Sequence, residues 1–449
     1  MRTQDVARRL AHLGEALLVG DAAAAAALFA PNACWRDLVA FSWNLTTCEG
    51  RDEVQRMLAA TLARVRPRDW RIEGEATADE AGVTSASFSF ETSVGRCEGS
   101  CRLTREGIFY TMLTALSELR GFEESAGPRR PRGVEHVADP RRMTWTQRRA
   151  ELANTLGFST QPYVLIIGGG QAGIGLAARL RRLGVPTLIV EKNGRAGDSW
   201  RNRYESLCLH DPVWYDHMPY MSFPDDWPVF CPKDKMGDWL ESYARLMELS
   251  YWPLTEAVSA AYDEAAGEWA VQVRRAEVSG SSTTLTLLRP KQLVLATGMS
   301  GKPNIPSIAG LADFGGQVYH SSAHRSSAPW KGKRCVVIGS NNSAHDICAD
   351  LWEHGAEVAM VQRSSTCVVR SVTLLAGMRD LYSEEAAAAG LSTHAADMAF
   401  ASTPYCLLPK TQIPVYEEHR RRDAEFYARL ERSGFRLDFG EDGSGLFCK

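Results

Sequence analysis

A short apolar strand that leads directly into a glycine-rich turn and a helix constrains this 449-residue chain most strongly. The strand is predicted over Tyr163–Ile167 and the helix over about 171–183. Gly168 permits the tight turn, Gly170 lets a phosphate approach the backbone, and Gly173 lets helix and strand pack closely. The start of the helix offers free N–H groups and a positive dipole end to a pyrophosphate. The segment therefore predicts a Rossmann-type unit with a dinucleotide site.

An acidic residue stands where such a unit holds the ribose. The next predicted strand, 187–190, ends at Glu191, which follows Gly168 by 23 residues. A carboxylate at this distance hydrogen-bonds a ribose 2′-hydroxyl. It would also repel a 2′-phosphate, so this first site is predicted to prefer FAD or NAD to NADP.

A second, less regular turn follows the predicted strand 335–338. Asn341 and Ala344 replace its second and third glycines, and the predicted nucleotide contacts are Gly339, Asn341, Asn342, Ser343 and Ala344. Asn tolerates left-handed backbone geometry, and Ala keeps helix and strand close. After a helix through 346–352 and a strand over 357–361 comes Arg363 with Ser364, 24 residues beyond Gly339. Because a guanidinium pairs well with a 2′-phosphate, the second nucleotide is predicted to be NADPH.

Composition sets the broad class of protein. The net charge of -3 gives no electrostatic case for nucleic acid or a membrane as partner. Eleven cysteines without a CxxC pair favour reduced thiols in a cytoplasmic protein. No metal-binding motif and no acid–base dyad is visible in the sequence, and a homodimer is left open.

Residues 1–125 are predicted to form a separate α+β domain with a curved sheet. We expect a helical opening as far as Phe29, strands over 35–45 and 83–91, and a helix over 53–66 between them. The pattern Phe29-Ala30-Pro31, Trp35-Arg36-Asp37 and Glu49-Gly50-Arg51 resembles the opening of SnoaL-like cone folds. In that superfamily an Asp on the first strand can act as a base, which the resemblance would assign to Asp37. The alternative is a domain that only packs, dimerises or shapes a neighbouring pocket.

The rest of the chain divides into three parts. A proline- and arginine-rich stretch over 126–160 is predicted to be an exposed linker. Residues 161–327 are predicted to be the FAD-binding domain and 328–449 the NADPH-binding domain. The predicted fold is thus an α+β cone-like domain followed by α/β, with two Rossmann-like domains, the second inserted in the first and incomplete.

The segments 197–200 and 203–212 resemble the flavin-side region of flavin-containing monooxygenases, closest to the YUCCA-like branch. The resemblance implies that Ser199, Trp200 and Arg203 contact the flavin and that His210 lies near its ring. Many family members have Asn near the position of His210. Considered without the resemblance, Trp200 and His210 are more often packing residues.

Two further segments extend this resemblance. The strand end Leu293–Gly298 resembles the motif at which two-dinucleotide flavoproteins pass the flavin, and its contacts would be Ala296, Thr297 and Gly298. Phe314, Gly316 and His320 resemble the fingerprint between the domains of flavin monooxygenases. His324 stands where the Baeyer–Villiger branch expects Trp, which disfavours that branch. The family assigns His320 to the coupling of domain motion and reduction; outside the fingerprint it would be a hydrogen-bonded linker histidine.

The chemistry implied by the resemblance is oxygenation of a small organic substrate by FAD, NADPH and dioxygen through a 4a-hydroperoxyflavin. Two alternatives remain. One is an NAD(P)H-dependent flavin oxidoreductase that does not oxygenate, and the other is a non-catalytic FAD-binding protein. Family members continue beyond the position of Lys449, so we expect a truncated second domain.

Overall fold

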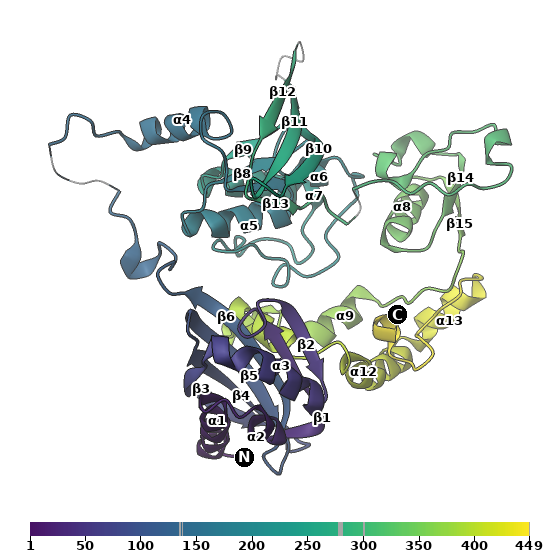
Figure 1. Ribbon diagram of the computed structural model, residues 1–449. Coiled ribbons are helices and arrows are strands. Elements are labelled where there is room, and N and C mark those ends of the chain that lie inside the picture. Colours follow the sequence, from purple (N-terminus) through teal and green to yellow (C-terminus); the bar gives the residue numbers. More distant parts are fainter. Residues whose placement is uncertain (134–135, 137, 277–281, 300, 449) are drawn as a thin grey trace. The chain divides into compact units, whose positions relative to one another are not determined.

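The computed structural model describes residues 1–133, 136, 138–276, 282–299 and 301–448 (Figure 1). By their internal contacts the residues form two compact units, Met1–Glu123 with Ser365–Lys449, and Glu124–Ser364. This grouping differs from the boundaries expected from the sequence, because the segment after 364 joins the N-terminal unit. The bounds of the FAD and NADPH domains as functional units remain a prediction.

The first unit is built on one mixed sheet with the strand order β2-β1-β6-β5-β4-β3. Its strands are β1 Phe29–Leu38, β2 Leu45–Glu49, β3 Arg68–Ala78, β4 Thr84–Glu91, β5 Gly95–Leu103 and β6 Phe109–Leu119. The β1–β6 pair is parallel and the other neighbours are antiparallel. Alternate residues of β4 and β5 are buried, as expected of strands with one face on a core.

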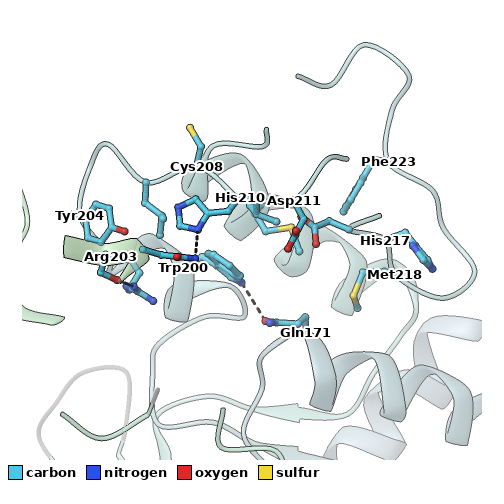
Figure 2. Close-up of a pocket in the computed structure, with 16 residues that line it drawn as sticks. Gln171, Trp200, Arg203, Tyr204, Cys208, His210, Asp211, His217, Met218 and Phe223 are labelled. Carbon is cyan, nitrogen blue, oxygen red and sulfur yellow. Dashed lines mark hydrogen bonds between the residues drawn. The ribbon is translucent and has the colours of Figure 1, made fainter. Parts of the chain in front are cut away.

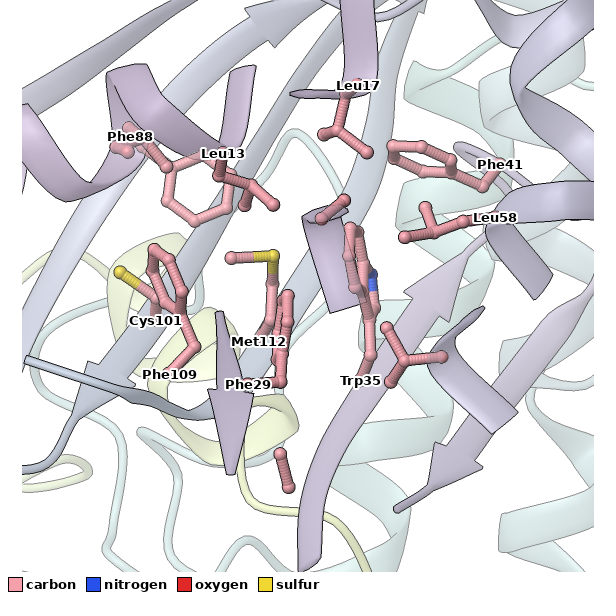
Figure 3. Close-up of a cluster of buried hydrophobic side chains, with 14 of the residues drawn as sticks. Leu13, Leu17, Phe29, Trp35, Phe41, Leu58, Phe88, Cys101, Phe109 and Met112 are labelled. Atoms are coloured by element: carbon pink, nitrogen blue, oxygen red, sulfur yellow. The ribbon is translucent and has the colours of Figure 1, made fainter. Parts of the chain in front are cut away.

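Three helices cover the inner face of this sheet: α1 Thr3–Leu18, α2 Ala22–Ala27 and α3 Arg51–Val65. Leu13 and Leu17, one helical turn apart, pack with Phe29, Trp35 and Met112 in the core (Figure 3). The predicted single helical opening is two helices instead. Gly20 has a φ of 78° and the Asp21 side chain accepts a hydrogen bond from Ala24 N, which starts the second helix.

The predicted strand over 35–45 is interrupted by a turn, and a buried carboxylate organises it. Asp37, on β1, is 0% exposed. It accepts hydrogen bonds from Phe41 N at 3.0 Å, from Ser42 N at 2.8 Å and Oγ at 2.7 Å, and from Thr114 Oγ1 at 2.8 Å. The local sequence pattern predicted an unbroken strand because it does not include the pairing with Thr114, which lies 77 residues away. The protein itself supplies the donors for this carboxylate.

The C-terminal segment adds helices to the same unit. They are α9 Ser371–Met378, α10 Glu384–Ala388, α11 Thr393–Ala401, α12 Leu408–Arg422 and α13 Ala424–Arg432. Arg102 on β5 donates to Ser402 Oγ at 2.9 Å, and Cys34 Sγ on β1 lies 3.2 Å from Cys406 Sγ. These contacts attach the segment to the N-terminal sheet.

The second unit contains a parallel sheet with the order β13-β7-β8-β9, as in a Rossmann-type α/β fold. Its strands are β7 Val164–Ile167, β8 Thr187–Val190, β9 Tyr251–Trp252 and β13 Gln292–Leu295. Helices α5 Gln171–Arg182 and α7 Lys233–Leu246 contribute to the core on one face of this sheet. The antiparallel strands β10 Thr255–Asp263, β11 Glu268–Ala276 and β12 Thr283–Leu288 form a further sheet, whose Val271, Val273 and Leu288 pack on the opposite face.

A second, smaller strand–helix–strand element completes this unit. It consists of β14 Arg334–Ile338, α8 Asn342–Glu353 and β15 Glu357–Val361, and its strands pair in parallel. Ile347 and Leu351 of α8 pack against Tyr204 and Leu207, which lie between α6 Asp198–Arg201 and α7. The predicted strand and helix positions around both glycine turns are confirmed to within a few residues.

The segment predicted to be a linker also contains a helix that the sequence analysis did not identify, α4 Trp145–Thr155. The described residues around it are mostly exposed. Thr144 caps α4 by accepting a hydrogen bond from Gln147 N at 3.2 Å. The connector is therefore mostly exposed but contains one helix among its described residues.

Candidate functional site

The first glycine turn is closely packed at two of its glycines and open at another. Gly168 has a φ of 110°, and a Cβ placed there would lie 2.2 Å from Ala296 O. A Cβ on Gly173 would lie 2.1 Å from Gly168 O. A Cβ on Gly170, the residue that precedes α5, would meet no atom within 4 Å. The first and third glycines therefore allow the protein to pack, whereas the second leaves open space beside the helix start.

Glu191 lies directly against this turn. It is 8% exposed, and its Oε2 accepts a hydrogen bond from Gly169 N at 2.7 Å. Its Oε1 accepts from Asn193 N at 2.9 Å and Nδ2 at 2.6 Å. A carboxylate has about four lone-pair sites, so one acceptor position is left for a ribose hydroxyl.

The strand-end motif also meets the turn. Ala296 N donates to Ile167 O at 2.8 Å, which continues the β13–β7 pairing past the end of the strand. Its carbonyl oxygen is the atom that excludes a side chain at Gly168. Gly298 has a φ of 82°, and Thr297 connects the two. The structure thus brings Ala296 together with the first turn.

A cavity of about 400 Å³ adjoins the turn at Gln171, the first residue of α5 (Figure 2). Trp200 Nε1 donates to Gln171 Oε1 at 3.2 Å, so one cavity wall is attached to the helix start. The large apolar residues that line the cavity are Trp200, Leu207, Leu209, Met218, Phe223 and Met236. Its ionisable lining residues include Arg203, Tyr204, Cys208, His210, Asp211 and Asp216. Ser199 is exposed and is not among the cavity-lining residues described.

His210 is held in the cavity wall by residues from α8. Its Nε2 lies 2.9 Å from Asp346 Oδ2, and its Nδ1 lies 3.1 Å from Asn342 Nδ2. Tyr204 donates its hydroxyl to the same Asp346 oxygen at 2.7 Å. The hydrogen bond to Asp346 raises the pKa of His210 above its usual value despite partial burial. Burial opposes ionisation of Asp346, but hydrogen bonds from His210 and Tyr204 outweigh it and lower its pKa.

We expect Asp346→Asn to lower the pKa of His210, because the substitution removes the carboxylate that stabilises the imidazolium. Since the folded pKa is raised, the stabilisation is present below the unfolded value of 6.5 and disappears as the pH rises through the folded value. An NMR titration of the His210 ring protons measures the shift. Glu353→Gln, an exposed change on the same helix, is the control and should leave the pKa unchanged. An unchanged pKa in Asp346→Asn would show that this pair does not form.

The second turn contributes to the same cavity. Asn342 and Ser343 are among its lining residues, and Arg203 Nη2 lies 3.5 Å from Ser343 Oγ. Gly339 has a φ of 129°, and Asn341 Oδ1 accepts from Asn342 N at 3.0 Å at the start of α8. The Cβ of Ala344 would lie 3.9 Å from a Cβ on Gly339, so this turn is less crowded than the first.

The remaining predicted residues lie apart from this cavity. His320 caps a short 3₁₀ turn, where its Nδ1 accepts a hydrogen bond from Ser322 N at 3.1 Å. Arg363 and Ser364 are exposed after the end of β15. None of the three is among the described residues that line the cavity.

Sequence analysis did not identify three acidic residues of the site: Asp211, Asp216 and Asp346. A signal was present for Asp346, because it follows Asn342 by one helical turn and so shares its helix face. Asp211 and Asp216 lie in an irregular segment without a periodic pattern, so only the folded chain places them in the cavity.

Two features are absent from the described part of the chain. No group of three or more His, Cys, Asp or Glu side chains there could hold a metal ion. Within the same residues, no helix combines the length and apolar character that crossing a bilayer demands.

The chain matches a known protein family and several individual relatives. Residues 162–400 match the family model described as pyridine nucleotide-disulphide oxidoreductase. Indole-3-pyruvate monooxygenase YUCCA1 from Oryza sativa subsp. japonica is 32% identical over 209 residues, covering 46% of this chain and 49% of that protein. The probable indole-3-pyruvate monooxygenase YUCCA7 from Arabidopsis thaliana is 37% identical over 207 residues, with 46% and 48% covered. The chain thus spans about half the length of the curated relatives it matches.

Among solved structures, a flavin-containing monooxygenase from Stenotrophomonas maltophilia aligns with a TM-score of 0.39 and 24% identity, covering 45% of this chain and 58% of that one. S-allyl-L-cysteine S-oxygenase from Allium sativum aligns with a TM-score of 0.40 and 25% identity, covering 46% and 52%.

Proposed function

Because this chain belongs to the pyridine nucleotide-disulphide oxidoreductase family, we propose that it binds FAD and NADPH and uses dioxygen to oxygenate a small organic substrate. The observation that carries the proposal is the open approach at Gly170, which lies next to a cavity of about 400 Å³. Two curated relatives, each matched over about half its length, are named as monooxygenases, which supports oxygenation over simple electron transfer.

The first turn fits FAD in residue type and in space. We propose that Gly168, Gly170 and Gly173 hold the diphosphate at the start of α5 and that Glu191 holds the adenosine ribose. The bound flavin supplies the chemistry, since a ring reduced by nicotinamide can activate dioxygen. Trp200 and the apolar walls would hold the ring and keep water away, and His210 would contact it from the side of α8. Ser199, Arg203, Ala296, Thr297 and Gly298 remain proposed cofactor contacts.

For NADPH, we propose that the second turn binds the diphosphate and that Arg363 and Ser364 bind the 2′-phosphate. Gly339, Asn341 and Ala344 would form the turn, while Asn342 and Ser343 also face the flavin cavity. His320 is proposed to couple reduction to motion of the segment between the two turns.

Arg363→Ala should weaken NADPH binding about tenfold or more and leave NADH binding nearly unchanged, because only NADPH carries the phosphate that a guanidinium pairs with. The measurement is the dependence of flavin reduction on the concentration of each nucleotide. The matched control is Arg334→Ala. Arg334 is exposed and lies at the start of β14, at the opposite end from the second glycine turn, so its loss should affect the binding of neither nucleotide. Equal weakening of both nucleotides by Arg363→Ala would contradict the phosphate assignment.

Rapid mixing distinguishes the proposed activity from its alternatives. NADPH should bleach the flavin, and oxygen should then produce a transient species before the oxidised spectrum returns. Direct reoxidation without a transient would favour an oxidoreductase that does not oxygenate. If neither nicotinamide reduces the flavin, a non-catalytic FAD-binding protein is favoured.

The remaining proposals concern the N-terminal unit and the cell. We propose that residues 1–125 form a SnoaL-like domain that serves in packing or association rather than in catalysis. The reason is that donors from the protein already hydrogen-bond the carboxylate of Asp37. A cytoplasmic location and a homodimer remain proposals as well.

A further inference from the structure

One cavity residue has a polar atom that the protein leaves unused. Asp216 lines the cavity, and its Oδ2 is buried without a hydrogen-bond partner among the described residues. Burying an unpaired carboxyl oxygen costs free energy, and such atoms are rare in folded proteins. Because Asp216 lines the cavity, this unpaired oxygen is a candidate partner for a polar group of a ligand.

The surroundings of Asp216 favour its neutral form. Burial, with a smaller contribution from the nearby carboxylate of Asp211, raises the pKa of Asp216 to about 7, and His210 acts in the opposite direction. Arg203, Tyr204, Cys208 and His217 are the other ionisable groups that line the cavity. The raised pKa favours the carboxylic acid, which offers one O–H donor and one acceptor oxygen.

The rest of the cavity suits a flat ring. Trp200, Phe223 and Met218 line it with aromatic and thioether surface, and Gln171 joins it to the start of α5. A ring that extends from a diphosphate at α5 would enter between these walls. Its polar edge would need complementary hydrogen-bonding groups inside the cavity.

We propose that Asp216 recognises the imide edge of the FAD ring, donating its O–H to a ring carbonyl and accepting a hydrogen bond from the adjacent ring N–H. A carboxylic acid and an imide present matching donor and acceptor pairs, so one side chain can satisfy two ring atoms. This assignment rests on the proposed binding of FAD, which it deepens. Asp216 would act as a binding and positioning residue for the ring.

Two substitutions test the assignment on the full chain. Asp216→Asn keeps one donor and one acceptor in the same place and does not titrate, whereas Asp216→Leu keeps the branched shape and replaces both oxygens with methyl groups. FAD affinity of the apoprotein is measured by quenching of flavin fluorescence at pH 6 and pH 8.5. We expect the Leu variant to bind about tenfold more weakly than the wild type at pH 6, and the Asn variant to bind within about twofold.

The pH dependence and a modified cofactor give independent readouts. Wild-type affinity should fall severalfold between pH 6 and pH 8.5, as the donor proton of Asp216 is lost, while the affinity of the Asn variant should change much less. FAD methylated at the imide nitrogen should bind the wild type more weakly than FAD does, and the Leu variant should not distinguish the two.

The outcomes separate this inference from the proposed function. If the wild type binds FAD but the Leu variant binds it equally well and also discriminates against the methylated cofactor, the role of Asp216 is wrong and FAD binding stands. If the wild type binds no FAD, both the proposed function and the role of Asp216 are wrong. Thermal unfolding of the apoproteins is the folding control: the Leu variant should melt no lower than the wild type, because Asp216 Oδ2 has no protein partner to lose.

Discussion

Gly170→Val is expected to weaken FAD binding about 10- to 100-fold while the chain stays folded. A Cβ at this position meets no protein atom within 4 Å, and the backbone there is extended, so we expect valine to fit the free protein. In the complex the same methyl groups would occupy the space through which a phosphate approaches the backbone. Forcing extra methyl groups into a close contact costs about 1–3 kcal/mol, which converts to that loss of affinity.

Fluorescence titration of the apoprotein with FAD measures this effect, and thermal unfolding without FAD measures the fold. Gly315→Val is the matched control, since a Cβ there also meets no atom within 4 Å and Gly315 lies outside the turn. It should change neither quantity. Undiminished FAD affinity in Gly170→Val would place the diphosphate somewhere other than the start of α5.

Asp37→Ala is expected to destabilise the N-terminal unit by about 3–5 kcal/mol. The substitution leaves Phe41 N, Ser42 N and Thr114 Oγ1 without the acceptor that they now share. Leaving buried donors without a charged acceptor costs more free energy than losing a typical surface contact does. The turn between β1 and β2 also loses its anchor, and Trp43 there has a φ of 57°.

Urea unfolding followed by tryptophan fluorescence measures the change, because Trp35 in this core would be exposed. Asp52→Ala, an exposed carboxylate in the first turn of α3, is the control and should cost less than about 1 kcal/mol. If Asp37→Ala unfolds at the wild-type urea concentration, the carboxylate does not hold the turn. A catalytic role for Asp37 would then become the better hypothesis.

Local patterns predicted the elements around the two glycine turns well. β8 and β15 have the bounds expected from the sequence, and α5 ends one residue before the predicted limit. The periodicity that predicts each of them lies within about a dozen neighbouring residues. The predicted strand over 35–45 was wrong in its second half, because the turn depends on Asp37 and Thr114, which are distant in sequence.

The residues of the candidate site also divide into those that a local pattern predicted and those that it did not. The glycines of the first turn and Glu191 were predicted from spacing, since a strand, a turn and a helix bring them together locally. The contact of His210 with Asp346 and the position of Asp216 in the cavity were not predicted. The His210–Asp346 contact joins a long irregular segment to a helix more than 100 residues later.

By itself, the sequence determined where the chain turns tightly against a helix start, because glycine spacing and strand periodicity act over a few residues. Only the tertiary structure decided which ionisable groups share the cavity, which carboxyl oxygen there lacks a partner, and that residues after 364 pack with the N-terminal sheet. These features depend on burial and on contacts between distant segments, which no local pattern records.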